Sequence, residues 1–84
     1  MAINLDIRNK LDPNTIVFDN QSYDNAIIGM TFDGRAIYSY ELMVEELIDE
    51  GFSEQDALDW IDYNTIRALP YIGERAPLIV HEIL

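Results

Sequence analysis

Two strand-like runs of apolar residues flank an Asp33-Gly34 pair in the segment AIIGMTFDGRAIYSY. An Asp-Gly pair is typical of a type I′ turn, in which both central residues have positive φ and the twist of the turn matches that of the strands. The pattern therefore predicts a β-hairpin with strands over residues 26–32 and 36–40.

The register of this hairpin decides which side chains face the core. Pairing of Phe32 with Arg35 puts Gly29 opposite Tyr38, whose ring can cover the bare backbone. Side chains then alternate between the two faces. The face that we expect on the core consists of Ile28, Met30, Phe32 and Ile37. The opposite face consists of Ile27, Ala36, Tyr38 and Tyr40.

After the hairpin, apolar residues recur at helical spacing with acidic residues between them. This pattern predicts an amphipathic helix over 40–50, which Gly51 ends as the residue after the C-cap. Ser53 begins a variant capping box and predicts a second helix over 54–68, which Pro70 stops. The buried stripe of the second helix is expected to consist of Ala57, Trp60, Ile61, Ala68 and Leu69.

The two ends of the chain also contain segments with strand or helix patterns. The run LIVHEIL indicates a strand over 78–83, covered on both faces or paired centrally in the sheet. The run TIVFD predicts a strand over 15–19, after a turn at 12–14. The first residues fit both a strand (Ile3, Leu5, Ile7) and a helical face (Ile3, Ile7, Leu11), and we expect a short helix or turn there.

Together these elements predict a single α+β domain over residues 1–84. A small antiparallel sheet, made of the hairpin 26–40 and the strand 78–83, carries a helical hairpin formed by 40–50 and 54–68. The chain has 84 residues, of which 49% are apolar, so it has enough apolar surface for a core.

The charge of the chain restricts the kinds of partner that it can bind. The net charge of −11 and the pI near 4.1 oppose binding to nucleic acid and to anionic membranes, and favour basic protein surfaces. The chain has no cysteine, no basic start followed by an apolar run, and no 18-residue apolar span. We therefore expect a cytoplasmic, soluble protein without disulfides.

The acidic residues are concentrated in the helical hairpin. Residues 36–66 contain no basic side chain, so like charges repel along each helix without compensation. A basic partner would relieve this repulsion, and the hairpin would present charge at a density comparable to that of DNA. The expected partner-binding residues are Glu41, Glu45, Glu46, Asp49, Glu50, Glu54, Asp56, Asp59, Asp62 and Tyr63. Trp60 and Tyr71 are further aromatic candidates.

The sequence contains no recognisable catalytic motif. It has no phosphate-binding loop, dinucleotide fingerprint or nucleophile elbow. The single histidine, His81, lies in an apolar run without an evident catalytic partner, and we interpret it as structural. Asp59 and Asp62 share a helical face, but two carboxylates at that spacing are common in an acidic helix. We therefore predict no enzyme activity, no metal site and no cofactor.

Three segments, DGRAIYSYE, WIDYNTIRALPY and GERAPLIV, span residues 33–80. Their combination resembles a group of small acidic proteins encoded in bacterial phages and prophages. The resemblance implies a phage setting and a bacterial cytoplasm, and it carries no catalytic residues. Small acidic phage proteins often inhibit host defence, for example by imitating DNA in front of a restriction enzyme or CRISPR effector. Arg67, the one base near the hairpin, is expected either to form an internal salt bridge or to contact the partner.

Two hypotheses follow. In the first, the chain is a non-enzymatic phage protein that blocks a basic, nucleic-acid-binding surface of a host defence protein through its acidic helical hairpin. In the second, it is a structural or assembly module of a phage, such as a homodimer joined through sheet edges, and the charge serves only solubility. Loss of binding at high salt would favour the first hypothesis.

Overall fold

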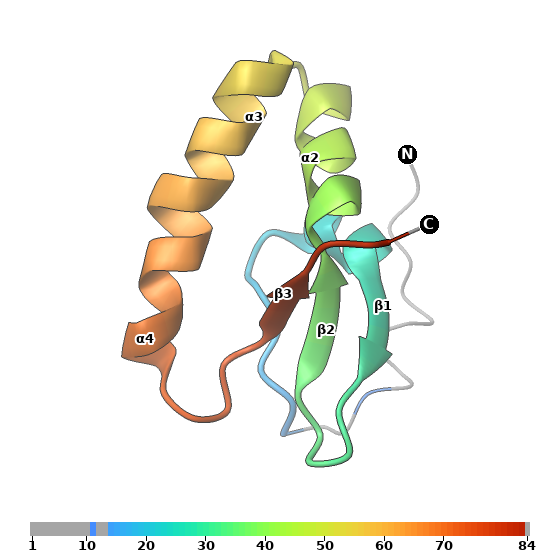
Figure 1. Ribbon diagram of the computed structural model, residues 1–84, viewed down its shortest axis with the longest axis vertical. Coiled ribbons are helices and arrows are strands. Elements are labelled where there is room, and N and C mark those ends of the chain that lie inside the picture. The colour runs from blue at the N-terminus through green and yellow to red at the C-terminus, as the bar shows by residue number, and fades with distance from the viewer. Residues whose placement is uncertain (1–10, 12–13, 84) are drawn as a thin grey trace.

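A three-stranded sheet packs with two helical elements that are joined by a sharp turn, the first above the sheet and the second beside it (Figure 1). The computed structural model describes residues 11 and 14–83. The helix or turn expected over the first residues, and residues 12–13 of the expected turn, lie outside this range. In chain order the elements are η1 (Gln21–Ala26), β1 (Ile27–Met30), β2 (Ala36–Ser39), α2 (Tyr40–Asp49), α3 (Glu54–Trp60), η2 (Ile61–Thr65), η3 (Ile66–Ala68), α4 (Leu69–Ile72) and β3 (Leu78–Val80). The predicted α+β class is confirmed.

The sheet has the order β1-β2-β3 and is mixed. β1 pairs with β2 antiparallel, but β3 pairs with β2 parallel, so the expectation of an antiparallel sheet was wrong for β3. The reason is the connection, because the two helical elements carry the chain back to the end of the sheet at which β2 begins. β3 lies at the edge and ends at Val80, rather than in the centre of the sheet with an end at 83. Residues 15–19, expected as a strand, form none.

The hairpin turn contains three residues and is not of type I′. Gly34 has φ of +87°, whereas Asp33 does not have the positive φ that type I′ requires. The Gly34 N–H donates to the Thr31 carbonyl (3.0 Å), and the Thr31 N–H donates to the Arg35 carbonyl (2.8 Å). This is the three-residue loop in which a turn is followed by a left-handed glycine.

The hairpin has a different register from the predicted one, and its opposite face is buried. Met30 pairs with Ala36 and Ile27 with Tyr38, with an irregularity at Ile28 between them. Ile27, Ala36 and Tyr38 were predicted on one face, and this face is buried because η1 and α2 pack on it. Ile28, Met30 and Phe32 are exposed, so the expected core face was wrong. Gly29 lies opposite Ile37 and not opposite Tyr38.

The turn between the helices forms as predicted. Gly51 has φ of +111°, its N–H donates to the Ile48 carbonyl, and the Phe52 N–H donates to the Leu47 carbonyl, both at 3.0 Å. This pair of bonds is the Schellman arrangement that ends a helix at glycine. The Ser53 hydroxyl then accepts the backbone N–H of Asp56 (3.1 Å) and caps α3.

Replacement of Gly51 by alanine is expected to destabilise the fold by about 1–2 kcal/mol, because an L side chain is strained at positive φ. A Cβ at this position meets no atom within 4 Å, so the cost comes from the backbone alone. Urea unfolding measures the effect. Gly29→Ala is the matched control, since Gly29 does not have positive φ and its new Cβ would lie 4.0 Å from Ile37. Equal losses in the two variants would contradict the prediction.

The second helical element, which we call the long helix, runs without a break from Glu54 to Ile72, through π and 3-10 turns. Pro70 therefore lies inside the helix rather than ending it near residue 68, and Gly73, with φ of +102°, follows its last residue. The 3-10 turn before Pro70 provides the bond from the Leu69 N–H to the Ile66 carbonyl. Proline has no backbone N–H. It is tolerated at the start of a helical turn because an N–H at that position would have no acceptor within the turn.

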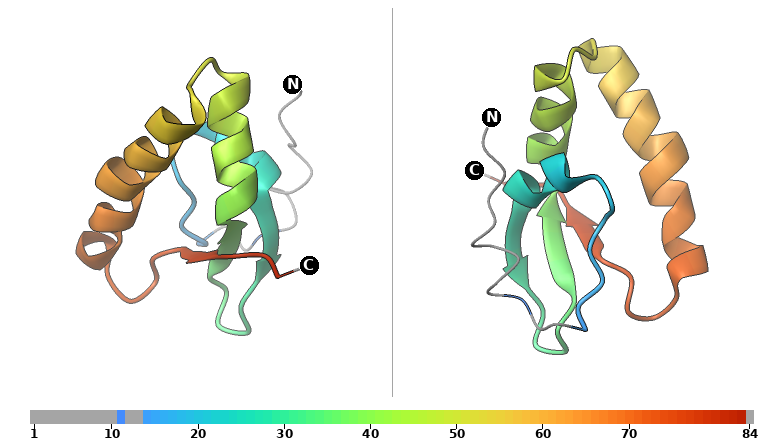
Figure 2. Two further views of the ribbon diagram at one scale, coloured as in Figure 1. Left: turned by 45° about the horizontal axis from the view of Figure 1, so that its top comes forward. Right: turned by 180° about the vertical axis from the view of Figure 1, so that it is seen from behind.

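The core lies between α2, η1, the sheet and the first half of the long helix. Tyr38, Met43, Leu47, Ala57 and Ile61 are buried at its centre. Ala57 and Ile61 were predicted there, but Trp60 is 47% exposed and does not belong to the buried stripe. The segment that leads into η1 passes between the sheet and the long helix (Figure 2).

Candidate functional site

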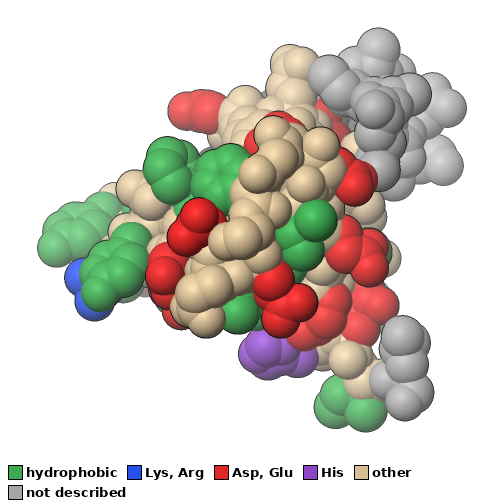
Figure 3. All heavy atoms as spheres, turned by 90° about the horizontal axis from the view of Figure 1, so that it is seen from above, with side chains coloured by type: hydrophobic (Ala, Val, Ile, Leu, Met, Phe, Trp, Pro, Cys, Tyr) green, Lys and Arg blue, Asp and Glu red, His purple; other side chains and the backbone are tan. Residues whose placement is uncertain are grey.

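Eight of the nine carboxylates of the helical hairpin are exposed, and Glu46 is buried. Seen from above, acidic side chains surround the end of the hairpin, and a basic group appears only at the margin of this view (Figure 3). The exposed acids do not share one face. Glu50, Asp56 and Asp59 line one hollow, whereas Glu41 and Glu54 line another.

Glu46 lies inside the protein against η1. It is 7% exposed, and burial raises the pKa of its carboxyl, while a hydrogen bond with Asn25 opposes that rise. The negative charges of Asp49 and Glu50 raise the pKa further. Glu46 was predicted to bind a partner, but its burial leaves little of its surface available for contact.

Glu46→Gln is expected to stabilise the protein at pH 7. Because the pKa of Glu46 is higher in the folded state than in the unfolded state, its contribution is most favourable at low pH and is lost as the pH rises. Urea midpoints should therefore rise in the variant at pH 7, and the gain should shrink below the ordinary glutamate pKa of 4.5. Glu45→Gln, on the exposed surface beside it, controls for general charge relief. Equal gains in both variants, or a gain independent of pH, would contradict the assignment.

His81 and Glu41 join the end of the described chain to the start of α2. The His81 Nδ1 lies 2.7 Å from the Glu41 Oε2, and the Glu82 N–H donates to the other oxygen at 2.7 Å. The hydrogen bond with His81, followed by that with Glu82, lowers the pKa of Glu41. The ring of His81 also contacts that of Tyr40, with a centroid distance of 5.0 Å. These contacts support the structural interpretation of His81.

The hollow lined by Glu50, Asp56 and Asp59 lies beside the turn that joins α2 to α3, and we call it the hairpin hollow. It has a volume of about 560 Å³. Its acidic residues are Glu50, Asp56 and Asp59, and its aromatic residues are Phe52, Trp60 and Tyr63. Trp60 and Phe52 contact edge to face at 5.7 Å, which fixes the tryptophan while leaving half of it exposed.

No lysine or arginine among residues 11 and 14–83 forms an ion pair with the three acids of the hollow. Asp59 accepts a hydrogen bond from Gln55 (3.0 Å), and Glu50 accepts one from the Ser22 hydroxyl. Neither of these groups is charged, so the negative charge of the hollow is not neutralised by the described side chains.

The spacing along the helix explains this grouping. Asp56, Asp59, Trp60 and Tyr63 are at positions i, i+3, i+4 and i+7, which form one helical face. The predicted partner surface followed the total number of acids rather than this spacing. Phe52 was not predicted there, because its place in the hollow depends on the Schellman turn.

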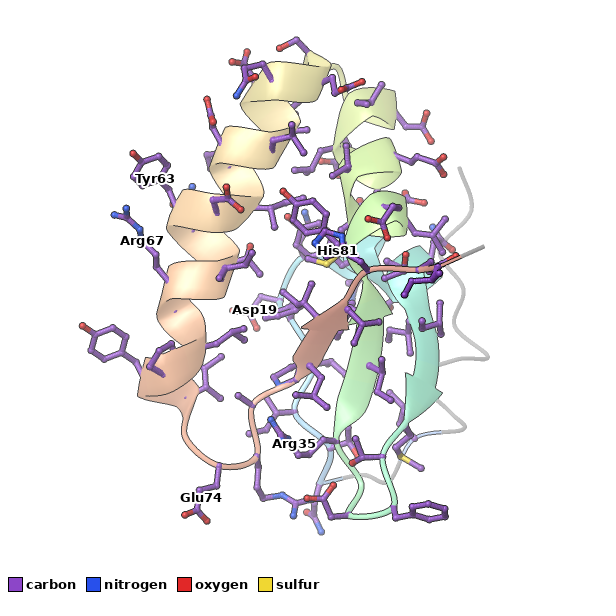
Figure 4. All side chains as sticks on the ribbon, in the orientation of Figure 1. Asp19, Arg35, Tyr63, Arg67, Glu74 and His81 are labelled. Carbon is purple, nitrogen blue, oxygen red and sulfur yellow. The ribbon has the colours of Figure 1, made fainter. Side chains whose placement is uncertain are left out.

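Arg67 lies on the outer side of the long helix beside Tyr63 (Figure 4). Its guanidinium carbon is 4.3 Å from the centre of the Tyr63 ring, a cation–π contact. The internal salt bridge expected for Arg67 is therefore absent from the part of the chain that the structure describes. The contact also shows that an aromatic ring of this surface can accept a guanidinium group.

Asp59 and Asp62 point to different surroundings despite their spacing. Asp59 lines the hairpin hollow, whereas Asp62 lies near the Tyr40 hydroxyl (3.5 Å) in a groove shared with His81. Within the described ranges no three histidine, aspartate or glutamate side chains are grouped as ligands for one metal ion.

No helix in the described part of the chain has both the length and the apolar character needed to cross a bilayer. Comparison of the chain with protein-family models, curated proteins and solved structures gave no match.

Proposed function

We propose that this chain is a phage-encoded, non-enzymatic inhibitor that blocks a basic, nucleic-acid-binding surface of a bacterial defence protein. The observation that carries the proposal is the hairpin hollow, in which three carboxylates without a described cation partner surround exposed Trp60 and Tyr63. The phage setting and the bacterial cytoplasm come from the resemblance of residues 33–80 to small acidic phage proteins.

The charges supply attraction and orientation. Proteins that bind DNA place arginine and lysine where phosphates lie, and a rigid helical surface with carboxylates offers the same sign of charge at similar spacing. Each exposed ion pair contributes little affinity, but together they raise the association rate and exclude acidic competitors. Binding also relieves the repulsion between Glu50, Asp56 and Asp59.

The aromatic residues supply affinity. Tryptophan and tyrosine are enriched among the residues that dominate protein interfaces, because they bury a large area with few rotatable bonds. Trp60 is 47% exposed and Tyr63 is 62% exposed, so both have surface left to bury. The proposed contact surface is therefore narrower than the nine carboxylates of the hairpin. It consists of Glu50, Asp56, Asp59, Trp60 and Tyr63.

A capture experiment from bacterial lysate tests the proposal. The bait is the tagged wild type, and a hollow variant combines Glu50→Gln, Asp56→Asn and Asp59→Asn. A matched control variant combines Glu45→Gln, Asp49→Asn and Glu54→Gln, which removes equal charge outside the hollow. The proposal expects wild type and control to capture the same nucleic-acid-binding protein and the hollow variant to lose it. Identical captures by all three, or none by any, would reject it.

A second candidate function is assembly through the sheet. β3 is one of the two edge strands of the described sheet, and Val80 at its end and Ile83 after it are exposed. An exposed edge is a template for pairing with another chain, including a second copy. Sedimentation distinguishes the two candidates, since a dimer that persists at high salt would favour assembly.

A further inference from the structure

A second groove, which we call the edge groove, lies between the end of β3 and the long helix. Its volume is about 260 Å³. One wall includes Ile79 and Val80 of β3, and the other includes Asp62, Ile66 and Leu69 of the long helix. None of the residues that line this groove also lines the hairpin hollow, so the two surfaces are separate.

The edge groove follows the free edge of the sheet. Neighbouring residues of a strand point to opposite faces, so a space that touches both Ile79 and Val80 runs along the edge of β3 rather than over one face. β3 pairs with β2 on one side, and on its other side Leu78, Ile79 and Val80 form no hydrogen bond within the described ranges. An edge strand presents unpaired N–H and C=O groups, so β3 offers them to a further strand.

The end of β3 is held in place by contacts of its own. The Glu41 carboxylate accepts the Glu82 N–H at 2.7 Å and lies 2.7 Å from the His81 Nδ1. These contacts tie the residues after β3 to the first turn of α2, where Figure 4 shows His81. The His81 ring also contacts the ring of Tyr40, which lines the groove. A strand that adds to β3 therefore meets a preorganised edge, which reduces the entropy lost on binding.

The spacing of side chains on the long helix matches one face of an extended segment. Asp62 and Ile66 are four residues apart, a separation of about 6 Å along a helix. Side chains two positions apart in a strand share a face and lie about 6.6 Å apart. Two such side chains of one added strand can therefore contact Asp62 and Ile66 together.

The groove has apolar side chains beside one negative charge. Ile66 is 37% exposed and Val80 is 36% exposed, so both have apolar area left to bury. Asp62 is exposed and forms no ion pair with a described cation. The Tyr40 hydroxyl lies 3.5 Å from the Asp62 carboxylate, which is too long to satisfy it. The groove therefore favours a segment in which an apolar side chain accompanies a basic one.

A single extended segment fits this edge better than a second copy of the chain. An added strand lies about 4.8 Å from its neighbour, so it needs only a narrow space. The long helix stands on the free-edge side of β3 and forms the other wall of the groove (Figure 1). A second copy would bring its own helices with its sheet, and these would meet the long helix before the two strand edges could pair.

We propose that the edge groove binds an extended segment of a partner protein, which adds to β3 as a fourth strand. The segment carries a basic side chain that pairs with Asp62 and, two positions away, an apolar side chain that packs on Ile66. This inference goes beyond the proposed function, because it assigns a second surface that a partner occupies independently of the hairpin hollow.

Titration with short peptides tests the inference on the full, isotope-labelled chain by NMR. The probe is acetyl-TKTVTV-amide, in which the lysine and both valines share one face of a strand. The amide signals of Leu78, Ile79 and Val80 should shift saturably, with Kd on the order of millimolar for one short strand. Acetyl-TETVTV-amide should bind several-fold more weakly, because its glutamate meets Asp62. Equal affinity of the two peptides would overturn the assigned role of Asp62.

N-methylated probes show whether the contact is the addition of a strand. The N–H groups of an added strand face β3 at every second residue. One version of acetyl-TKTVTV-amide is N-methylated at its second and fourth residues, and another at its third and fifth. The version whose methyl groups face β3 should lose saturable binding. Unchanged affinity in both versions would overturn strand addition.

Variants assign the binding to the groove. Asp62→Asn should weaken binding of the basic probe by about threefold, as for one exposed ion pair. Ile66→Arg should abolish it by placing bulk and positive charge in the groove. The matched controls Asp49→Asn and Ile48→Arg change exposed positions of α2 outside the groove and should bind like wild type. Circular dichroism and urea unfolding verify that each variant folds. Wild-type affinity of Ile66→Arg, no saturable shift, or shifts centred on the hairpin hollow would overturn the inference.

Sedimentation of the free chain identifies the other possible occupant of the edge. A monomer whose β3 signals respond to the probe supports the proposal. A dimer whose β3 signals do not respond would show that a second copy covers this edge, and would overturn it.

Discussion

Tyr38→Ala is expected to remove most of the stability of the fold. Tyr38 is completely buried, its ring lies 4.7 Å from that of Phe18, and its hydroxyl accepts the Phe18 N–H at 3.1 Å. Truncation of a buried aromatic residue costs about 3–5 kcal/mol, and the Phe18 N–H would also lose its partner. Small domains are typically stable by only about 5–15 kcal/mol, so urea unfolding should show a large loss or a partly unfolded protein.

Two further variants separate the causes. Tyr38→Phe keeps the ring and removes only the hydroxyl, so it should cost about 1–3 kcal/mol. Tyr71→Ala removes an aromatic side chain that is 92% exposed, and it should change stability by less than about 0.5 kcal/mol. A loss of less than about 1 kcal/mol for Tyr38→Ala would contradict the central position of Tyr38 in the core.

Loss of partner binding in the hollow variant is the second large effect. If each of the three acids forms one ion pair worth about 0.7–1 kcal/mol, their joint removal raises Kd by roughly 30–150-fold. The control variant at Glu45, Asp49 and Glu54 loses the same formal charge. It should weaken binding by less than about fivefold, because these three side chains do not line the hollow and exposed charges that form no direct ion pair contribute little affinity.

These values are measured with the captured partner by titration calorimetry or biolayer interferometry. Both variants keep the buried Glu46 and the capping Ser53, so the fold is expected to persist. Equal weakening by the two variants would mean that net charge alone governs binding, and that the hollow has no special role.

The helices and their turn could be predicted from the sequence because they depend on local chemistry. Gly51 and Ser53 end and begin helices through bonds to residues a few positions away. The hairpin itself was also predictable, but its register was not. An Asp-Gly pair fits both a two-residue turn and a three-residue loop, and the two give different registers. The alternation of side chains grouped Ile27, Ala36 and Tyr38 on one face but did not show which face the helices would cover.

The direction of β3 was predictable from the order of the elements along the chain. Two helices lie between the second strand of the hairpin and the last strand, and a connection of that kind allows parallel pairing. The length of the second helix was not evident from the sequence, because Pro70 usually stops a helix, whereas here it begins a new turn.

In the candidate sites too, features that depend on local spacing could be predicted and features that join distant residues could not. Asp56, Asp59 and Tyr63 share a helical face, and their spacing in the sequence predicts this. The part of the hollow that they form could therefore be predicted. The space lined by Asp19, Tyr23 and Thr65 could not be predicted, since it joins residues more than 40 positions apart in the sequence and depends on a π turn. The burial of Glu46 likewise depends on η1, which has no strong sequence signature.

The salt dependence of partner binding shows whether the hollow forms the proposed ion pairs. Kd of wild type, hollow variant and control variant is measured for the captured partner between about 50 and 200 mM salt. We predict a steep increase of Kd with salt for wild type and control, and a clearly shallower slope for the hollow variant, because three ion pairs are missing. The same slope for all three proteins would show that the hollow does not contact the basic surface, and would contradict the proposed function.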